Sequence, residues 1–389
     1  MRLNRLRLRH FRAHRDAEFL FGPVLNVLVG PNGRGKTNVL EAIHVLCLSR
    51  SFLGLEDRHL VQFGRPFFEL EGFLESDQGL AWTIRVFYEP ESGKRFWLNQ
   101  APLERAADLV GRFPVVVLAP QDRDLTAGGP ETRRRFLDNV ISQASPLYLE
   151  DLLAYRRALR QRNALLWKHR QERQSAWLEV LEPWNYALVH YGSRLLWRRM
   201  RFLEAFQDLL RRAYEEVAEV SEEPRLVYRP SFEVAPVAGP EAIAERFHEA
   251  LKEAWPLERR RARTLVGPHL DEVVFYLDGV ELRRYASQGQ HRSFVLALKW
   301  AQYAYLQEVL MERPLLLLDD VLSDLDARRA QAFLEVLRSG RFGQVFLTTT
   351  EADLFRQAHP NVRLLEIAAP SCMDLGVGHG QPPLAGTSA

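Results

Sequence analysis

A glycine-rich segment between residues 30 and 37 carries the most specific chemistry in this chain. It fills every fixed position of a phosphate-binding P-loop. All eight residues are candidate nucleotide contacts: Gly30, Pro31, Asn32, Gly33, Arg34, Gly35, Lys36 and Thr37. Glycines let the backbone wrap phosphate oxygens with its N–H groups pointing inward. Lys36 is expected to reach the β- and γ-phosphates, and Thr37 to ligate Mg²⁺. The predicted cofactors are therefore ATP and Mg²⁺.

A run of four leucines followed by two aspartates supplies the second half of a nucleotide site. Leu315–Leu318 predicts a buried strand, and the carboxylates emerge at its C-terminal end, where α/β sheets bind ligands. Asp319 is expected to hold Mg²⁺, directly or through water, while Asp320 stands where a general base would orient the attacking water. Lys36 and Asp320 are thus the predicted catalytic residues. A capping aspartate after a core strand would explain one carboxylate, but not its match to the glycine-rich loop.

A short polar motif at residues 286–290 indicates the class of P-loop ATPase. It resembles the ABC signature and offers Ser287, Gly289 and Gln290 as nucleotide contacts. Ser287 is placed as the N-cap of a helical run from His291 to Leu306. In ABC-type ATPases, such a helix points its N-terminus at the γ-phosphate bound by the partner subunit. The motif therefore predicts an ATP-dependent homodimer joined head to tail.

Two loops are expected to complete the site. Gln121 follows the apolar run Pro114–Leu118 as a Q-loop residue would. Ser323–Asp326 has the spacing of a D-loop, which contacts the opposite subunit.

The switch position departs from many ABC proteins. Where they have a histidine after the next strand, this chain reads Thr348, Thr349 and Thr350. A threonine can hydrogen-bond the γ-phosphate but cannot carry charge, and Asp320 reaches less far toward water than a glutamate. We therefore expect slow ATP hydrolysis.

The segments around these motifs alternate between strands and helices, with one long exception. Strands are predicted at Val24–Val29, Phe67–Leu74, Leu80–Tyr88, Arg95–Asn99, Pro114–Leu118, Leu226–Phe232 and Val273–Leu277. A helix is predicted at Asn38–Leu48, directly after the P-loop. From about Glu131 to Glu223, glycine almost vanishes and apolar residues recur at helical spacing.

Four regions follow from this pattern. Residues 1–130 form the first part of an ATPase head, 131–223 a helical insertion, 224–368 the rest of the head, and 369–389 a disordered tail. The predicted fold class is α/β, an ABC/SMC-type P-loop ATPase head with a second, mainly helical inserted domain. An insertion of about 90 residues is too short for the long coiled-coil arms of most SMC-like proteins.

The composition adds broad limits. The chain has 389 residues, 47% hydrophobic and 26% charged, with net charge +2, which excludes a mainly disordered chain. Its apolar runs are far shorter than the about 20 residues that cross a bilayer, so we expect no membrane partner and a cytoplasmic location. Cys47 is expected to be a buried apolar filler, and Cys372 lies in the tail.

Basic charge gathers in the helical insertion. Residues 131–212 carry 16 Lys and Arg against nine Asp and Glu, an excess that could bind DNA phosphates without reading sequence. A solvated arginine face is an equal alternative at each position. The candidate DNA contacts are Arg156, Arg160, Arg194, Arg198 and Arg201. Arg133–Arg135 are alternatively expected to cap or brace the domain junction.

Several blocks closely resemble the bacterial RecF recombination-mediator family over nearly the whole chain. They are Leu6–Arg12, Gly30–Ile43, Gly129–Asp138, Thr264–His269 and Leu317–Asp326. The most specific pieces are the arginine-rich part of the third block and the Gly-Pro-His of the fourth. Leu270 and Glu272 depart from the Arg and Asp that are typical of the family.

The resemblance implies a factor of DNA replication, repair and the SOS response. It would dimerise on ATP and bind double-stranded DNA near junctions with single strands. With RecR and RecO, it would help RecA to load onto DNA. A weak DNA-dependent ATPase activity would then reset it.

Three other interpretations compete. A transporter-energising subunit predicts a short distance from P-loop to signature and a switch histidine, and both are absent here. An SMC-like ATPase of another DNA-maintenance or defence system shares all nucleotide motifs. A metalloenzyme would need clustered ligands, whereas the 11 histidines are scattered. His10 and His14 lie in a strand–loop region and are expected to be surface residues.

Overall fold

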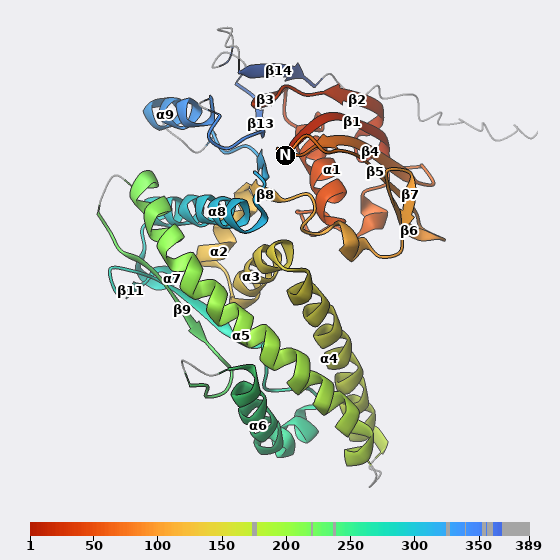
Figure 1. The fold of residues 1–389 in the computed structure, drawn as a ribbon, viewed down its shortest axis with the longest axis vertical. Coiled ribbons are helices and arrows are strands. Elements are labelled where there is room, and N and C mark those ends of the chain that lie inside the picture. The colour runs from red at the N-terminus through yellow and green to blue at the C-terminus, as the bar shows by residue number, and fades with distance from the viewer. Residues whose placement is uncertain are drawn as a thin grey trace, which may run out of the picture.

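The described part of the chain contains three β-sheets and a long helical hairpin (Figure 1). The structure is a computed structural model that describes residues 1–172, 177–218, 221–235, 239–323, 327–338, 340–351, 355 and 361–367. The predicted disordered tail, with Cys372, lies outside these residues.

A five-stranded parallel sheet underlies the nucleotide motifs. Its strands follow the order β14 (Val362–Glu366), β3 (Leu25–Val29), β13 (Val345–Thr349), β12 (Leu315–Leu318) and β8 (Val115–Leu118). Leu315 and Leu317 of β12 face one core, while Leu316 and Leu318 face the other. Burial on both faces explains the unbroken apolar run of β12, whereas β14, at one end of the sheet, is mostly exposed. Because the strands are parallel, the P-loop, Asp319 and Thr350 all follow strand ends at one edge of the sheet.

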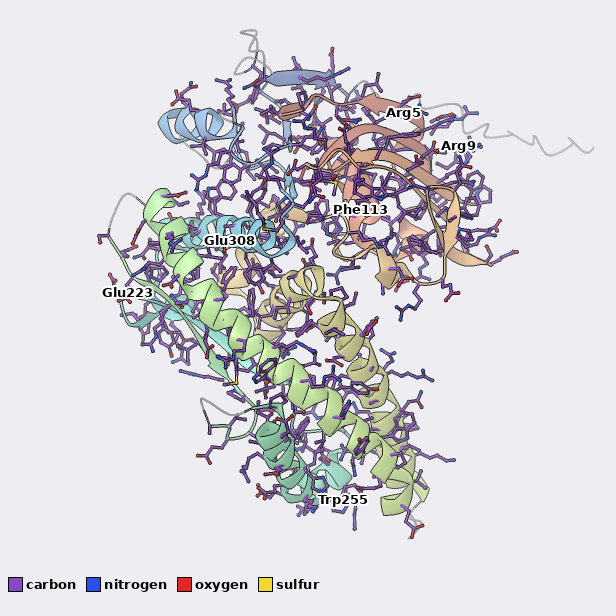
Figure 2. The ribbon with its side chains drawn as sticks, viewed as in Figure 1. Arg5, Arg9, Phe113, Glu223, Trp255 and Glu308 are labelled. Carbon is purple, nitrogen blue, oxygen red and sulfur yellow. The ribbon has the colours of Figure 1, made fainter. Side chains whose placement is uncertain are left out.

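An antiparallel sheet covers helix α1 (Lys36–Leu48), which follows the P-loop (Figure 1). Its order is β2 (His14–Leu20), β1 (Arg2–Phe11), β4 (Phe68–Glu75), β5 (Ala81–Glu89), β6 (Gly93–Leu98) and β7 (Ala101–Leu103). Leu6 and Leu8 of β1 are buried in the core with α1, whereas Arg5 and Arg9 lie on the outer side of the sheet (Figure 2). Cys47 on α1 is buried and free, as expected.

Helices occupy most of the region where the helical insertion was predicted, between residues 130 and 217. This region consists of α3 (Pro130–Ala144), α4 (Pro146–Glu172) and α5 (Trp177–Val217), and α4 and α5 run side by side away from the parallel sheet and from the sheet that covers α1 (Figure 1). Beside them lies α6 (Pro240–Arg261), a helix that the sequence analysis did not predict. Its buried Ile243, Phe247 and Leu251 recur every four residues, a signal that was available in the sequence.

A three-stranded sheet packs against α5. It contains β9 (Pro224–Arg229), β10 (Glu272–Leu277) and β11 (Val280–Glu281). Strand β9 ends at Arg229 rather than at the predicted Phe232, because Pro230 has no N–H for the ladder. Elements on both sides of residue 223 thus pack on α5, and the domain boundary expected there stays a prediction.

Two of the three arginines expected to brace this region, the buried Arg133 and the half-buried Arg134, hold α3 to residues that precede and begin β10. Arg133 donates to the Glu272 carboxylate at 2.7 Å, and Arg134 donates to the backbone carbonyl of Asp271 at 2.7 Å. Arg135 instead pairs with Glu131 on the exposed side of the same helix, at 3.1 Å.

The remaining helices are short or lie beside the parallel sheet. They are α2 (Asp124–Ala127), α7 (Leu282–Tyr285), α8 (Gln288–Leu310) and α9 (Ala327–Arg338), with short 3-10 turns at Asp57–His59, Ala106–Leu109 and Pro120–Arg123. Among the helices in the described ranges, none is both long and apolar enough to cross a bilayer.

Candidate nucleotide site

The glycine-rich loop connects the end of β3 to the start of α1, as the motif requires. Gly33 and Gly35 take left-handed φ angles of 78° and 92°, which side-chain-bearing residues rarely adopt. A Cβ on Gly35 would also lie 2.8 Å from Nε2 of His14. The loop therefore needs glycine at this position for both its backbone shape and its close packing.

The ammonium of Lys36 lies within this loop. Its Nζ donates hydrogen bonds to the carbonyl of Gly30 at 2.6 Å and to that of Pro31 at 3.0 Å. Burial lowers the pKa of Lys36, and the nearby carboxylates of Asp320 and Asp319 oppose that shift. Phosphate oxygens would offer the ammonium stronger, charged acceptors than the two carbonyls.

Thr37 and Asp319 meet, although 282 residues separate them in the sequence. The Thr37 hydroxyl donates to Oδ1 of Asp319 at 2.8 Å. Burial raises the pKa of Asp319, while hydrogen bonds from Thr348 and Thr37 partly offset the rise. A hydroxyl and a carboxylate at the mouth of a phosphate loop are oxygen donors of the kind that Mg²⁺ takes, so this pair fits that ion.

Thr348 positions both aspartates, a role that the sequence analysis missed. Its hydroxyl donates to Oδ1 of Asp319 at 2.8 Å and accepts from the N–H of Asp320 at 2.9 Å. Asp320 takes a left-handed φ of 51°, and its side chain is exposed. Thr348 thereby holds the carboxylate of Asp319 and the backbone of Asp320.

The three threonines of the expected switch segment differ in burial. Thr348 and Thr349 are buried, and the Thr349 hydroxyl accepts from the N–H of Glu351 at 3.1 Å. Thr350 is exposed, one residue beyond the end of β13. Thr350 is consequently the member of the three that is open to a ligand at this edge of the sheet.

His14 is buried beneath the P-loop, so its expected surface location was wrong. Its Nε2 lies 3.1 Å from the carbonyl of Gly35. A carbonyl only accepts, so the imidazole donates from Nε2. Burial lowers the pKa of His14, which keeps the ring neutral at neutral pH, although the bond to Gly35 opposes that shift. The local sequence around His10 and His14 did not indicate burial, because the burial of His14 depends on the long-range approach of β2 to the loop.

The signature motif begins α8, and Ser287 is its N-cap, as predicted. The Ser287 hydroxyl accepts from the N–H of Gln290 at 3.2 Å, and the Gln290 side chain accepts from the N–H of Ser287 at 2.8 Å. Gln290 also donates to the Glu222 carboxylate at 2.8 Å. Ser287 and Gly289 are exposed. Within the described ranges, no hydrogen bond or ion pair joins this motif to the P-loop of its own chain.

The other loop residues are placed in part. Gln121 lies exposed in the 3-10 turn after β8. The end of β8 is close to Asp319, because the N–H of Asp319 donates to the carbonyl of Leu118 at 2.9 Å. Ser323 donates to the carbonyl of Asp320 at 2.8 Å. The rest of the expected D-loop, residues 324–326, lies outside the described residues.

Four of the five candidate DNA contacts form ion pairs within the chain. Arg156 pairs with Asp138 at 2.9 Å, and both Arg194 and Arg198 pair with the buried Asp151. Arg201 pairs on the surface with Glu204, and Arg160 is exposed. Arg198 is the weakest candidate, because only 18% of its side chain is exposed.

A phosphate loop joined to a strand-end aspartate, a capped signature helix and a helical insertion together define a P-loop ATPase head of the ABC/SMC type. The family model described as RecF/RecN/SMC N terminal domain matches residues 2–369. The chain is 49% identical over 358 residues to the DNA replication and repair protein RecF of Salinibacter ruber, covering 92% of this chain and 87% of that protein. It is 43% identical over 360 residues to the RecF of Chloroherpeton thalassium, covering 92% and 97%. The chain belongs to the RecF family.

Solved structures agree with this assignment. One described as "Structure of the recombination mediator protein RecF-ATPrS in RecFOR pathway" matches with a TM-score of 0.86 at 30% identity, covering 94% of this chain and 96% of that one. A second, of RecF with ATP, matches with a TM-score of 0.82 at 31% identity over 90% and 94%. An Smc head domain from Pyrococcus furiosus, 14% identical with a TM-score of 0.50, shares the fold over 90% of this chain and 89% of that one.

Proposed function

We propose that this chain is an ATP-gated DNA repair factor that closes into a homodimer when it binds ATP and Mg²⁺. The observation that carries the proposal is the 2.8 Å contact between Thr37 and Asp319, which unites the two nucleotide motifs at one edge of the sheet. Relatives solved with ATP support the identity of the nucleotide. Lys36 would bind the β- and γ-phosphates, and Thr37 with Asp319 would hold Mg²⁺.

Hydrolysis would be slow and would serve to open the dimer. Asp320 is the proposed general base, since it is exposed beside Asp319 and its backbone is fixed by Thr348. Gln121 and Thr350 are exposed just after β8 and β13, the two strands that neighbour β12 in the sheet. An uncharged threonine would stabilise charge at the γ-phosphate less than an imidazolium would.

The dimer would form when the signature helix of one chain covers the ATP bound by the other. Ser287, Gly289 and Gln290 lie at the N-terminus of α8, where backbone N–H groups and the helix dipole favour an anion. ATP can shift this equilibrium only as far as it binds the closed dimer more tightly than the open chains.

The proposed substrate is duplex DNA at a junction with a single strand. The basic excess of residues 131–212 supports a surface that neutralises phosphates, with Arg160 and Arg201 as its most exposed candidates. The chain belongs to the RecF family, and a solved RecF structure is described as part of the RecFOR pathway. Both findings support cooperation with RecR and RecO in loading RecA, which would take place in the cytoplasm.

Binding to gapped duplex DNA, with and without ATP·Mg²⁺, tests this function. We expect ATP to tighten binding, and we expect the affinity to fall linearly with salt on logarithmic axes. Lys36→Met should lose the ATP effect and keep the residual binding. If ATP leaves the DNA affinity of the wild-type chain unchanged, the gating proposal is wrong.

A further inference from the structure

One aromatic side chain stands in solvent on a turn that is bonded to the β1–β2 hairpin. Phe63 is 91% exposed, more than any other large hydrophobic side chain among the described residues. It occupies the corner of a tight turn, in which the N–H of Arg65 donates to the carbonyl of Gln62 at 3.0 Å and Gly64 has a φ of 74°. The turn therefore holds the ring away from the core of its own chain.

The turn is fixed to the tip of the β1–β2 hairpin. The Gln62 N–H donates to the carbonyl of His10 at 2.7 Å, and the Gln62 side chain donates to the carbonyl of Ala13 at 3.5 Å. Phe11 and Val61 form a β-bridge directly before it. These contacts fix the position of Phe63 relative to the hairpin tip.

The same hairpin tip touches the P-loop from its other side. A Cβ on Gly35 would lie 3.2 Å from the Cβ of Ala13 and 3.3 Å from Oδ1 of Asn38. Asn38 belongs to the first turn of α1, where P-loop proteins bind the inner phosphates that carry the nucleoside. Ala13 therefore links the place where the nucleoside leaves the loop to the turn that presents Phe63.

We propose that Phe63 stacks on the adenine of bound ATP and is the residue that recognises the base. This inference rests on the proposed ATP site and adds its base-binding part. A purine is flat and apolar on both faces, so an aromatic ring can stack on it. Nucleotide binding would also cover an apolar ring that is otherwise left in water.

The test compares two ligands that share the phosphates and differ in the base. Calorimetric titration with ATP·Mg²⁺ and with inorganic triphosphate·Mg²⁺ is carried out on the wild-type chain, Phe63→Ala and Phe63→Trp. We expect Phe63→Ala to weaken ATP binding about thirtyfold, the middle of the range for a lost stack, and to leave the binding of inorganic triphosphate unchanged. Phe63→Trp should bind ATP at least as tightly as the wild type.

A matched control and a second measurement separate the alternatives. Tyr186→Ala removes a 70%-exposed aromatic side chain from α5 and should leave both affinities unchanged. Sedimentation at saturating ATP should still show the dimer of Phe63→Ala. Unchanged ATP affinity, equal loss of both ligands, or loss of the dimer at saturating ATP would each overturn the stacking role. A wild-type chain that binds neither ligand would overturn the ATP site itself, and this inference with it.

Discussion

The P-loop half of the proposed ATP site and its signature half differ in how many of their side chains are held by hydrogen bonds within one chain. Thr37, Asp319 and Thr348 are joined by two hydrogen bonds of 2.8 Å, so side chains of one chain hold this half together. Ser287 and Gln290 bond mainly to each other at an exposed helix end. This difference fits the proposal that one chain binds the nucleotide and that a second chain completes the site.

A substitution in the P-loop half of the site should have the largest effect on ATP affinity. Lys36→Met removes the ammonium that would bind two phosphates, and each charge-assisted hydrogen bond contributes about 1.5–3 kcal/mol. We expect ATP affinity to fall by at least about a hundredfold, as measured by calorimetry. Tight ATP binding by this variant would show that the loop is not the phosphate site.

Breaking the exposed half should separate dimerisation from binding. Ser287→Arg places a long cationic side chain where the partner's nucleotide would dock, so the ATP-dependent dimer should be lost in sedimentation. ATP binding by the single chain should stay within about twofold, since no hydrogen bond or ion pair among the described residues joins the motif to its own P-loop. Ser287→Thr keeps a capping hydroxyl and should keep the dimer. An unchanged dimer in Ser287→Arg would rule out the shared site.

Removing the proposed base should hold the two halves together. Asp320→Asn cannot accept a proton from water, and general-base catalysis contributes about 10²–10⁴-fold. We expect turnover to fall by about a hundredfold and the ATP-bound dimer to persist. If turnover in a single-cycle assay is unaltered, another group serves as the base.

Loosening the link between the aspartates should have a smaller effect. Thr348→Val keeps the side-chain shape and removes both hydrogen bonds, which leaves the N–H of Asp320 without its acceptor at a cost of about 1–3 kcal/mol. Urea unfolding should show this loss of stability, and a higher Mg²⁺ concentration should be needed for turnover. Thr348→Ser, which restores the hydroxyl, should recover both, and a Thr348→Val protein with wild-type stability and Mg²⁺ dependence would contradict the positioning role.

Acid should weaken the fold through histidines that are buried in the neutral state. Burial lowers the pKa of His44 to about 3 and that of His269 to about 4, and it also lowers the pKa of His14. The unfolded chain takes up protons near pH 6.5, so it binds more protons than the folded chain below that pH. Stability should therefore fall as the pH drops from about 6.5 toward 4, by up to about 1.4 kcal/mol per pH unit for each histidine. Urea midpoints at a series of pH values measure this slope, and His44→Gln should reduce it.

Local patterns made the nucleotide motifs predictable from the sequence. The P-loop depends on glycine geometry and the capping box of Ser287 on residues three apart, so both can be identified within a short window. The buried strands of the parallel sheet were equally recognisable, because burial on two faces leaves unbroken apolar runs.

Features that depend on distant contacts could not be found in this way. The burial of His14 comes from the approach of β2 to Gly35, and the role of Thr348 comes from the pairing of β13 with β12. Arg198 looked like a surface cation until the fold brought Asp151 on α4 beside it. Helix α6 is different, since its apolar spacing was present in the sequence and was overlooked.

Mixing two inactive variants tests the shared site most directly. Lys36→Met lacks a working P-loop and Ser287→Arg lacks a working signature, so each should remain monomeric with ATP·Mg²⁺. A mixed dimer would pair the intact P-loop of one chain with the intact signature of the other. Sedimentation of the mixture should therefore show an ATP-dependent dimer that contains one copy of each variant. A mixture that stays monomeric under conditions where the wild-type chain dimerises would contradict a nucleotide site shared between chains.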